Sequence, residues 1–301
     1  MNVLDKIKQA CRTVLTGEPM SKHTYYKIGG PADMYAAPES VEELKNVIQI
    51  CRQYKTDYFM LGNGSNILVS DNGFRGCVID TSAKFKSISV SDGVISAEAG
   101  CTMNKIAKTA LKYSLTGFEE LAGVPGTIGG ALVMNAGCYG KEISEVVSEA
   151  EILDNGSIMT IKRPEMIFGY RESSLRSRII VSAKIRLVKG IKQDIEEKMN
   201  EIQAKRKSSQ PLHLPSCGSV FKRPEGHFAG RLIEDCGLKG KSIGGAMVSN
   251  MHAGFIVNSG GATASDVAEL IRVIKDKVYN RTGIRLKEEV IYVGFSKEDL
   301  K

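Results

Sequence analysis

Hydrophobic and polar positions in the first third of the chain alternate between helical and strand-like periods. Ser40 and Glu43 have the S-x-x-E spacing of a capping box, which predicts that a helix begins there. The apolar residues behind this cap fall on one helical face: Leu44, Val47, Ile48 and Cys51. Residues 57–70 predict an apolar strand, a glycine-rich turn and a second strand, and residues 74–80 predict a third.

Two hairpins and two helices are predicted in the middle of the chain. Residues 85–100 form a hairpin pattern around Ser91-Asp92-Gly93, and residues 146–161 form another around Asp154-Asn155-Gly156. A helix fits residues 103–113, with Ile106, Ala107, Ala110 and Leu111 on one side. Residues 179–188 predict a strand, residues 192–207 predict a charged helix, and Pro211 and Pro215 then mark a boundary.

The last third predicts strands near 218–221 and 254–257, and a final strand over 284–294. Its strongest helix begins at Thr263 or Ser265 and ends near Gly283. One apolar stripe follows this helix: Val267, Leu270, Ile271, Ile274 and Val278. The whole pattern is α+β in three lobes rather than a regular βαβ array. We place the predicted domains at 1–84, 85–207 and 208–301.

Composition indicates a folded intracellular protein. The 301 residues are 42% hydrophobic and 25% charged, and no apolar run approaches the roughly 18 residues that span a bilayer. The N-terminus lacks the apolar centre of a signal peptide, so we expect a cytoplasmic location. The seven cysteines are odd in number and lack CxxC spacing, which argues against a disulfide framework and a zinc site. We expect no bound metal.

The net charge of +7 suits a polyanionic partner. Nucleic acid, a dinucleotide, a nucleotide-sugar diphosphate or plain solvated surface would each account for it. Motifs for nucleic-acid binding are missing, and the absence of Trp leaves few surfaces on which bases could stack.

Three glycine-rich segments are candidates for binding phosphates or a flat cofactor. Gly62-Asn63-Gly64-Ser65-Asn66 follows an apolar strand, where glycines let backbone N–H groups approach a phosphate, although a tight turn between strands would give the same pattern. Residues 122–137 are uncharged and interrupted by Gly, which disfavours an ordinary helix and suits a backbone wall against a flat ligand. Tyr26-Lys27-Ile28-Gly29-Gly30 is the third candidate.

Taken together, these and other motifs resemble the UDP-N-acetylenolpyruvoylglucosamine reductase family, and they occur in the same order from about residue 20 to 295. The residues that carry the resemblance are YKIGGPAD, GNGSNIL, AGVPGTIGGALVMNAG, GYRESSLR, GSVFKRP, LKG, HAGFIVN and the closing EEV. The resemblance implies a two-lobed FAD-binding region of vanillyl-alcohol-oxidase (PCMH) type, lobe I being 1–84 and lobe II 85–207. It implies a C-terminal α+β substrate-binding domain over 208–301.

The resemblance also implies a reaction. NADPH would reduce a non-covalently bound FAD, and flavin N5 would then pass hydride to the enolpyruvyl group of a UDP-sugar in peptidoglycan synthesis. Arg171 matches the family's arginine that stabilises the developing charge, although most arginines form structural ion pairs. Ser219 matches the proton donor, and Glu289 matches the assisting glutamate. Glu288 would point to the opposite face of a strand, so only one of the two glutamates can enter the site.

The implied binding residues form two groups. Cofactor contacts are expected from Tyr26, Gly29, Gly62, Asn63, Gly64, Ser65, Asn66, Gly123, Pro125, Gly126, Thr127, Gly129, Gly130, Asn135, Ala136 and Gly137. Substrate contacts are expected from Tyr170, Lys222, Arg223, Arg231, Lys239 and His252. Lys241 and the basic run Lys205-Arg206-Lys207 lie near them in sequence.

This chain departs from the family's better-known branch. That branch has Asn where Arg223 stands here, and it carries an insert with a tyrosine that closes over the sugar. No Tyr occurs between Arg171 and Tyr279, so the chain resembles the shorter branch. The sequence does not identify the residue that takes the place of that tyrosine.

Two rival functions also fit parts of the sequence. One is an oxidoreductase of the same flavin fold that acts on an alcohol or lactone, and the other is a non-catalytic binder of nucleotides or RNA. We expect a monomer that associates with neither a membrane nor nucleic acid.

Overall fold

A computed structural model describes residues 2–300, which form two compact units. The first unit contains the residues up to Leu15, Met34–Asn63 and Gly76–Arg206. The second contains Thr16–Asp33, Gly64–Arg75 and the residues from Lys207 onward. The chain changes unit within β1 (Val14–Pro19), β2 (Pro31–Ala36) and β5 (Phe74–Asp80). The three predicted domains stay a prediction.

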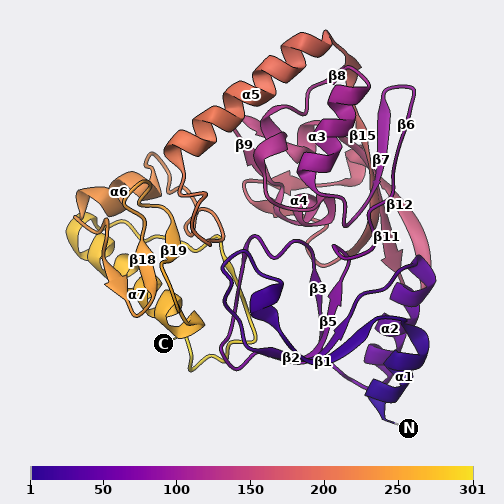
Figure 1. The fold of residues 1–301 in the computed structure, drawn as a ribbon, viewed down its shortest axis with the longest axis horizontal. Helices are drawn as coiled ribbons and strands as arrows, with labels where there is room; N and C mark the ends of the chain where they lie inside the picture. Colours follow the sequence, from indigo (N-terminus) through magenta and orange to yellow (C-terminus); the bar gives the residue numbers. More distant parts are fainter. Residues whose placement is uncertain (1, 301) are drawn as a thin grey trace. The chain divides into compact units, whose positions relative to one another are not determined.

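The capping-box prediction is confirmed at α2 (Val41–Gln53). Ser40 is the N-cap, and its hydroxyl accepts a hydrogen bond from the N–H of Glu43 at 3.2 Å. The four apolar residues predicted on one face are all buried. α1 (Val3–Ala10) packs beside α2, and β3 (Tyr58–Leu61) pairs in parallel with β5 next to these helices (Figure 1). A hydrophobic core therefore lies between the two helices and these strands.

A five-stranded sheet forms the middle of the first unit, in the order β12-β11-β15-β7-β6. The strands are β6 (Ile88–Ser91), β7 (Val94–Glu98), β11 (Val147–Asp154), β12 (Ser157–Lys162) and β15 (Ile179–Arg186). Both predicted hairpins are confirmed. Asn155 and Gly156 both have positive φ, 46° and 81°, as a two-residue hairpin turn requires. α3 (Met103–Lys112) and α4 (Ile128–Met134) pack beside β7 (Figure 1).

α4 corrects the expectation that the glycines of residues 122–137 would disfavour a helix. Thr127 is its N-cap, and its hydroxyl accepts a hydrogen bond from the N–H of Gly130 at 3.3 Å. A Cβ on Gly129 would lie only 3.1 Å from the Cβ of Ala99. The glycine thus lets the helix approach the backbone beyond β7, and this close packing outweighs its low helix propensity.

Short strand pairs and one long helix complete the first unit. The pairs are β8 (Leu115–Thr116) with β16 (Val188–Lys189), β9 (Gly137–Cys138) with β10 (Lys141–Glu142), and β13 (Phe168–Gly169) with β14 (Glu172–Ser173). Single 3₁₀ turns cover Glu120–Gly123, Ile143–Glu145 and Arg163–Glu165. The predicted charged helix is confirmed as α5 (Lys192–Ser209), whose last residues belong to the second unit.

The second unit packs two helices around a small sheet and one core. Its elements are α6 (Ala229–Asp235), α7 (Ala264–Thr282), β17 (Ser242–Ile243), β18 (Ala246–Val248), β19 (Ile256–Asn258) and a 3₁₀ turn over Met20–Lys22. β4 (Ile67–Val69) pairs in parallel with β20 (Ile291–Val293). α7 packs on β17 and β18, and Figure 1 shows it beside β18. The predicted helix is confirmed: Thr263 caps it, its apolar stripe is buried, and Gly283 ends it with a φ of +72°.

Two predicted strands of the second unit are shorter than expected. Residues 218–221 form only isolated bridges, Ser219 with Phe255 and Phe221 with Glu288, and the final strand is reduced to β20. Gly218 has a φ of +83°, which breaks the extended backbone at one end. Pro224 lies just beyond the other end and has no N–H to continue a ladder.

Three further facts apply to the described residues. All seven cysteines are free thiols. No group of three or more His, Cys, Asp or Glu side chains in residues 2–300 is placed to hold a metal ion. Over the same range, no helix combines the length and apolar character needed to cross a membrane.

Candidate active site

Within the first unit, Gly62 and Asn63 from one predicted glycine-rich segment lie against a second such segment, residues 122–137. A Cβ on Gly62 would lie 2.7 Å from the hydroxyl oxygen of Thr127, so only glycine allows this approach. Beside it, the side-chain amide of Asn63 donates to the carbonyl of Pro125 at 2.5 Å. The turn after β3 therefore lies directly against the segment that leads into α4.

This junction leaves backbone donors available. Thr127 is only 1% exposed, yet among residues 2–300 neither its backbone N–H nor that of Gly126 makes a hydrogen bond. Buried N–H groups are nearly always paired in folded proteins, so the N–H of Thr127 suits an acceptor from a bound ligand, and the half-buried Gly126 places a second donor beside it. The uncharged wall and the unpaired donors fit the flat, phosphate-bearing cofactor predicted for this segment.

The third segment is part of the second unit and packs in its core. The side chain of Tyr26 is fully buried, and its carbonyl accepts a hydrogen bond from the Asn258 amide at 3.1 Å. The Tyr26 hydroxyl has no hydrogen-bond partner among the described residues. Burial, followed by the nearby Cys217 thiol, raises the pKa of Tyr26 well above its ordinary value. Gly29 packs against Val69 with a φ of +132°. Cofactor contacts from this segment stay a prediction.

Asn135 connects the glycine-rich helix to the hairpin that carries Arg171. It ends α4 in the left-handed conformation, with a φ of 43°, and is 1% exposed. Its amide nitrogen donates to the carbonyl of Gly169 at 3.0 Å and to the carboxylate of Glu142 at 2.7 Å. Its amide oxygen accepts from the N–H of Ser144 at 3.3 Å. One buried side chain thus ties together three segments of the first unit.

Arg171 lies in the two-residue turn between β13 and β14, next to Tyr170. Its φ of +57° is unusual for a residue other than glycine. One guanidinium nitrogen donates to the carbonyl of Gly137 at 3.0 Å, and the guanidinium carbon lies 5.0 Å from the centre of the Tyr170 ring. These contacts direct the cation toward the end of the glycine-rich segment, within the first unit.

Arg206 adds a second cation at this place, and the sequence reasoning had not singled it out from its basic run. A Cβ on Gly123 would lie 2.5 Å from Cδ of Arg206, so the arginine packs directly on the glycine. Burial raises the pKa of the nearby Cys138 thiol, while the positive charges of Arg206 and Arg171 act in the opposite direction. The sequence signal is the glycine, since only its missing side chain leaves room for Arg206.

Ser219 and Glu289 both belong to the second unit and lie on neighbouring segments. Ser219 is exposed, and its hydroxyl makes no hydrogen bond among the described residues. The N–H of Glu289 donates to the carbonyl of Val220 at 2.7 Å, and its carbonyl accepts from the Asn66 amide at 3.1 Å. Asn66, predicted in a glycine-rich segment, thus holds the backbone of the predicted catalytic glutamate.

The two glutamates have different surroundings in the second unit. Glu288 makes an ion pair with Lys275 of α7 at 2.6 Å. Glu289 lies near Cys217, whose thiol pKa is raised to about 12 by burial, with a further contribution from the charge of Glu289. Because Cys217 precedes Ser219 by two residues, Glu289 is the glutamate whose charge reaches the segment containing Ser219.

Several of the predicted substrate cations have partners in the second unit. Arg231 pairs with Asp235 at 3.0 Å, and Lys239 pairs with Glu234 at 2.8 Å. The guanidinium carbon of Arg223 lies 4.6 Å from the centre of the Phe228 ring.

Two further predicted substrate contacts, Lys222 and His252, make hydrogen bonds within the second unit. The N–H of Lys222 donates to the carbonyl of Lys287 at 2.8 Å. His252 accepts the N–H of Gly254 on Nδ1 at 3.1 Å, and burial lowers its pKa below 6.5. The assignment of the predicted site residues to substrate or cofactor stays a prediction.

The fold defines a class of protein. Residues 32–162 match a sequence model of the FAD binding domain, which places the chain among flavoproteins with an additional C-terminal α+β unit. Residues 210–293 match the model of the C-terminal domain of UDP-N-acetylenolpyruvoylglucosamine reductase.

Known proteins extend both matches to nearly the whole chain. The reductase of Alkaliphilus oremlandii is 47% identical over 93% of each chain, and that of Caldanaerobacter subterraneus is 48% identical over 97% of this chain and 98% of the relative. The crystal structure of the Thermus caldophilus reductase, at 33% identity, covers 93% of this chain and 98% of its own with a TM-score of 0.80. The chain belongs to the UDP-N-acetylenolpyruvoylglucosamine reductase family, which confirms the resemblance.

Proposed function

We propose that this protein reduces UDP-N-acetylglucosamine enolpyruvate to UDP-N-acetylmuramate, with NADPH as the source of electrons and non-covalently bound FAD as cofactor. This reaction belongs to peptidoglycan synthesis and thus to cell-wall formation, cell shape and cell division. The observation that carries the proposal is the contact between the two glycine-rich segments, at Gly62 with Thr127 and at Asn63 with Pro125. Kinship over nearly the full length with proteins named for this activity supports the choice of substrate.

Arg171, Ser219 and Glu289 each have a different role in the proposed reaction. When bound, the flavin supplies the hydride that adds to the methylene carbon of the enolpyruvyl group. Arg171 binds the substrate carboxylate and stabilises the negative charge that develops on the neighbouring carbon, because its planar guanidinium suits a carboxylate. Ser219 then donates its hydroxyl proton to that carbon, and Glu289 assists the transfer. One hydride and one proton together convert the double bond into the lactyl group.

The site fits this division in two respects. The guanidinium of Arg171 is oriented by the carbonyl of Gly137, so it does not need to be immobilised when substrate arrives. Ser219 is exposed at the segment held by Glu289, which leaves its hydroxyl accessible to a ligand. We propose that the enzyme works as a cytoplasmic monomer.

Anaerobic half-reactions test the proposal. NADPH is used to bleach the flavin of the purified protein, NADP is removed, and the enolpyruvyl UDP-sugar is added. The yellow colour should return as the lactyl product forms. Ser219→Ala should reduce flavin with NADPH at nearly the normal rate, while its second half-reaction falls by about 10²- to 10⁴-fold because the proton donor is lost.

Ser216→Ala is the matched control, since it removes a hydroxyl from the same segment and should leave both half-reactions unchanged. Equal losses in both halves for Ser219→Ala would reject the proton-donor role. Reduced protein that reacts rapidly with oxygen but ignores the UDP-sugar would reject the substrate and favour an oxidase of the same fold. A colourless protein that takes up no flavin would reject both.

A further inference from the structure

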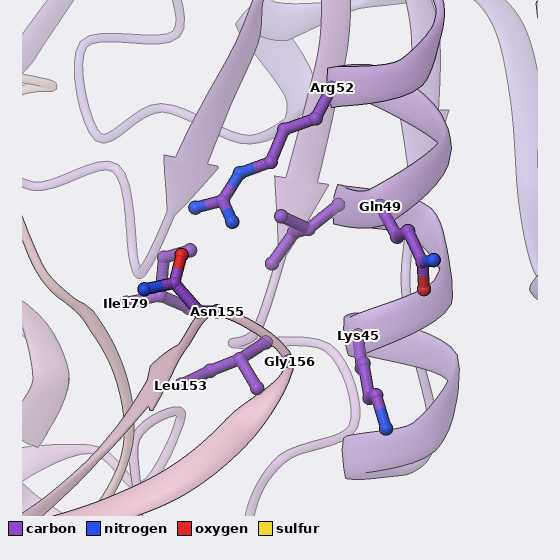
Figure 2. Close-up of a pocket in the computed structure, with 8 residues that line it drawn as sticks. Lys45, Gln49, Arg52, Leu153, Asn155, Gly156 and Ile179 are labelled. Carbon is purple, nitrogen blue, oxygen red and sulfur yellow. The ribbon is translucent and has the colours of Figure 1, made fainter.

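A pocket of about 510 Å³ lies in the first unit, between α2 and the turn of the β11–β12 hairpin (Figure 2). Its volume is within the range of small-molecule sites. The lining residues are Lys45, Ile48, Gln49, Arg52, Leu153, Asn155, Gly156 and Ile179. None of them belongs to the predicted cofactor, substrate or catalytic sets.

One face of α2 provides one wall of this pocket. Lys45, Ile48, Gln49 and Arg52 are spaced i, i+3, i+4 and i+7, so they occupy one face of α2 over two turns. Lys45 and Arg52 therefore leave the helix about 10 Å apart along its axis. Arg52 extends over the pocket in the direction of Asn155 (Figure 2).

The hairpin turn provides the opposite wall. A Cβ on Gly156 would lie 3.4 Å from Cε of Lys45, so the turn packs closely on the aliphatic part of that lysine. The floor consists of Ile48, Leu153 and Ile179, each no more than 7% exposed. The concavity is therefore built on the hydrophobic core rather than on mobile side chains.

Charge in this pocket is uncompensated. Its lining contains two cations and no carboxylate. Among the described residues, neither Lys45 nor Arg52 forms an ion pair, although several carboxylates of this unit do pair with a lysine or arginine. Asp154, which stands between the lining residues Leu153 and Asn155 in the sequence, pairs instead with Arg178 at 3.8 Å. The pocket therefore has a positive potential without an internal counter-ion.

We propose that this pocket binds a small organic anion, a phosphate or carboxylate attached to a compact apolar group. The guanidinium of Arg52 and the side-chain amide of Asn155 bind the anionic group, since a guanidinium pairs with either anion in a forked geometry. The apolar group lies over Leu153 and Ile179, and Lys45 adds attraction from the other end. A pocket of this volume encloses a small molecule and would accommodate little of a macromolecule.

Binding should be modest and sensitive to salt, because Arg52 is exposed and exposed charges are screened over about 8 Å at physiological ionic strength. The proposed site is separate from the reductase reaction, so a failure of one proposal leaves the other standing.

Amide NMR on the full-length, FAD-loaded protein tests this inference. Phenyl phosphate and benzoate are the two anionic probes, and benzyl alcohol is the neutral control of similar shape. Either anion should shift the amide signals of Gln49, Arg52, Asn155 and Gly156, and benzyl alcohol should not. A response to phenyl phosphate alone identifies the natural ligand as a phosphate, and a response to benzoate alone identifies it as a carboxylate.

Arg52→Ala should weaken probe binding by about tenfold, and Lys45→Ala by a smaller factor. Lys108→Ala is the matched control, because it removes one exposed positive charge from α3 and should leave the affinity unchanged. Unaltered thermal unfolding of the Arg52 variant shows that it is folded. Equal weakening by Lys108→Ala, or shifts confined to residues 62–66 and 123–137, would overturn the proposal.

Discussion

Asn135 illustrates how much of the candidate site depends on single side chains. Helix propensity does not explain its position, because it lies in the left-handed region at the end of α4, where Asn and Gly are favoured. The buried amide then bonds to Gly169, Glu142 and Ser144. The sequence motif predicted that Asn135 belongs to the site. It could not predict that the residue acts through the hairpin of Arg171, because that contact spans 34 residues.

Replacing Asn135 separates its conformational role from its hydrogen bonds. Asn135→Ala should lower the free energy of unfolding by about 2 to 4 kcal/mol, because it loses buried hydrogen bonds and places a Cβ in the left-handed region. Asn135→Gly tolerates that backbone and should lose about 1 to 3 kcal/mol. Chemical denaturation measures both values.

Both Asn135 variants should also lower kcat/KM for the UDP-sugar, since the turn that presents Arg171 loses its tether. The outcome that contradicts this role is a pair of variants that are destabilised as expected yet retain full activity. Equal stability of the Ala and Gly variants would contradict the conformational part alone.

At the scale of elements, local sequence signals were sufficient wherever the element is stabilised locally. The cap of α2, the Asn155-Gly156 turn and the apolar stripe of α7 each predicted the observed element. The prediction that residues 122–137 disfavour a helix is wrong, because α4 forms by packing Gly129 on Ala99, a contact that helix propensity does not include. The strand predicted at residues 218–221 is wrong because of a local effect. The apolar residues there predict a strand, but the positive φ of Gly218 turns the backbone.

The N-terminus of α7 shows that a locally predicted helix also receives distant support. Asp71 accepts hydrogen bonds from the N–H groups of Ala264 and Ser265 at 2.7 and 2.9 Å. Asp266 accepts from the N–H groups of Thr263 and Gly245. Partial burial acts to raise the pKa of Asp266, but these hydrogen bonds lower it below its ordinary value of 3.8. Two carboxylates therefore stabilise the positive end of the helix.

Asp266→Asn should destabilise the protein by about 0.5 to 2 kcal/mol at neutral pH, the usual contribution of a helix cap. The native pKa of Asp266 lies below its unfolded value, so its contribution is complete above pH 3.8 and is lost as the pH falls through the lower native pKa. The stability difference between wild type and Asp266→Asn should therefore shrink in acid. Urea denaturation at pH 7 and near pH 3 measures it, with Glu269→Gln, on the exposed part of the same helix, as the control. A difference that is independent of pH would contradict this role.

At the scale of the molecule, the order of motifs along the chain was more informative than any one motif. GNGSN alone fits an ordinary turn, yet its match together with GYRES, GSVFK and EEV predicted the family that the comparisons confirm. The assembly of each unit from three separate stretches was beyond sequence reasoning. It depends on contacts such as those of Asn66 with Glu289 and of Asp71 with Ser265, which join positions about 200 residues apart.

Removal of FAD should expose the dependence of the first unit on its cofactor. Gly126 and Thr127 carry backbone N–H groups with no protein partner among the described residues, so these donors should gain acceptors only in the loaded protein. A ligand present at about 100 times its Kd stabilises the native state by about 2.7 kcal/mol. Apoprotein should therefore melt at a lower temperature than the FAD-loaded protein, and added FAD should restore the difference.

Hydrogen exchange locates this stabilisation. Added FAD should slow amide exchange at residues 62–63 and 123–137 of the apoprotein, and riboflavin, which lacks the phosphates and the adenosine, should protect them much less. The hairpin turn at Asn155 and Gly156 is the internal control, because it lies outside the predicted cofactor contacts and should exchange at the same rate in both states. Equal protection of the glycine-rich segments and of the hairpin turn at Asn155 and Gly156 would mean that FAD stabilises the unit globally without engaging the glycine-rich segments. Protection at residues 62–63 alone would exclude the wall formed by α4 and would assign the cofactor to the turn after β3.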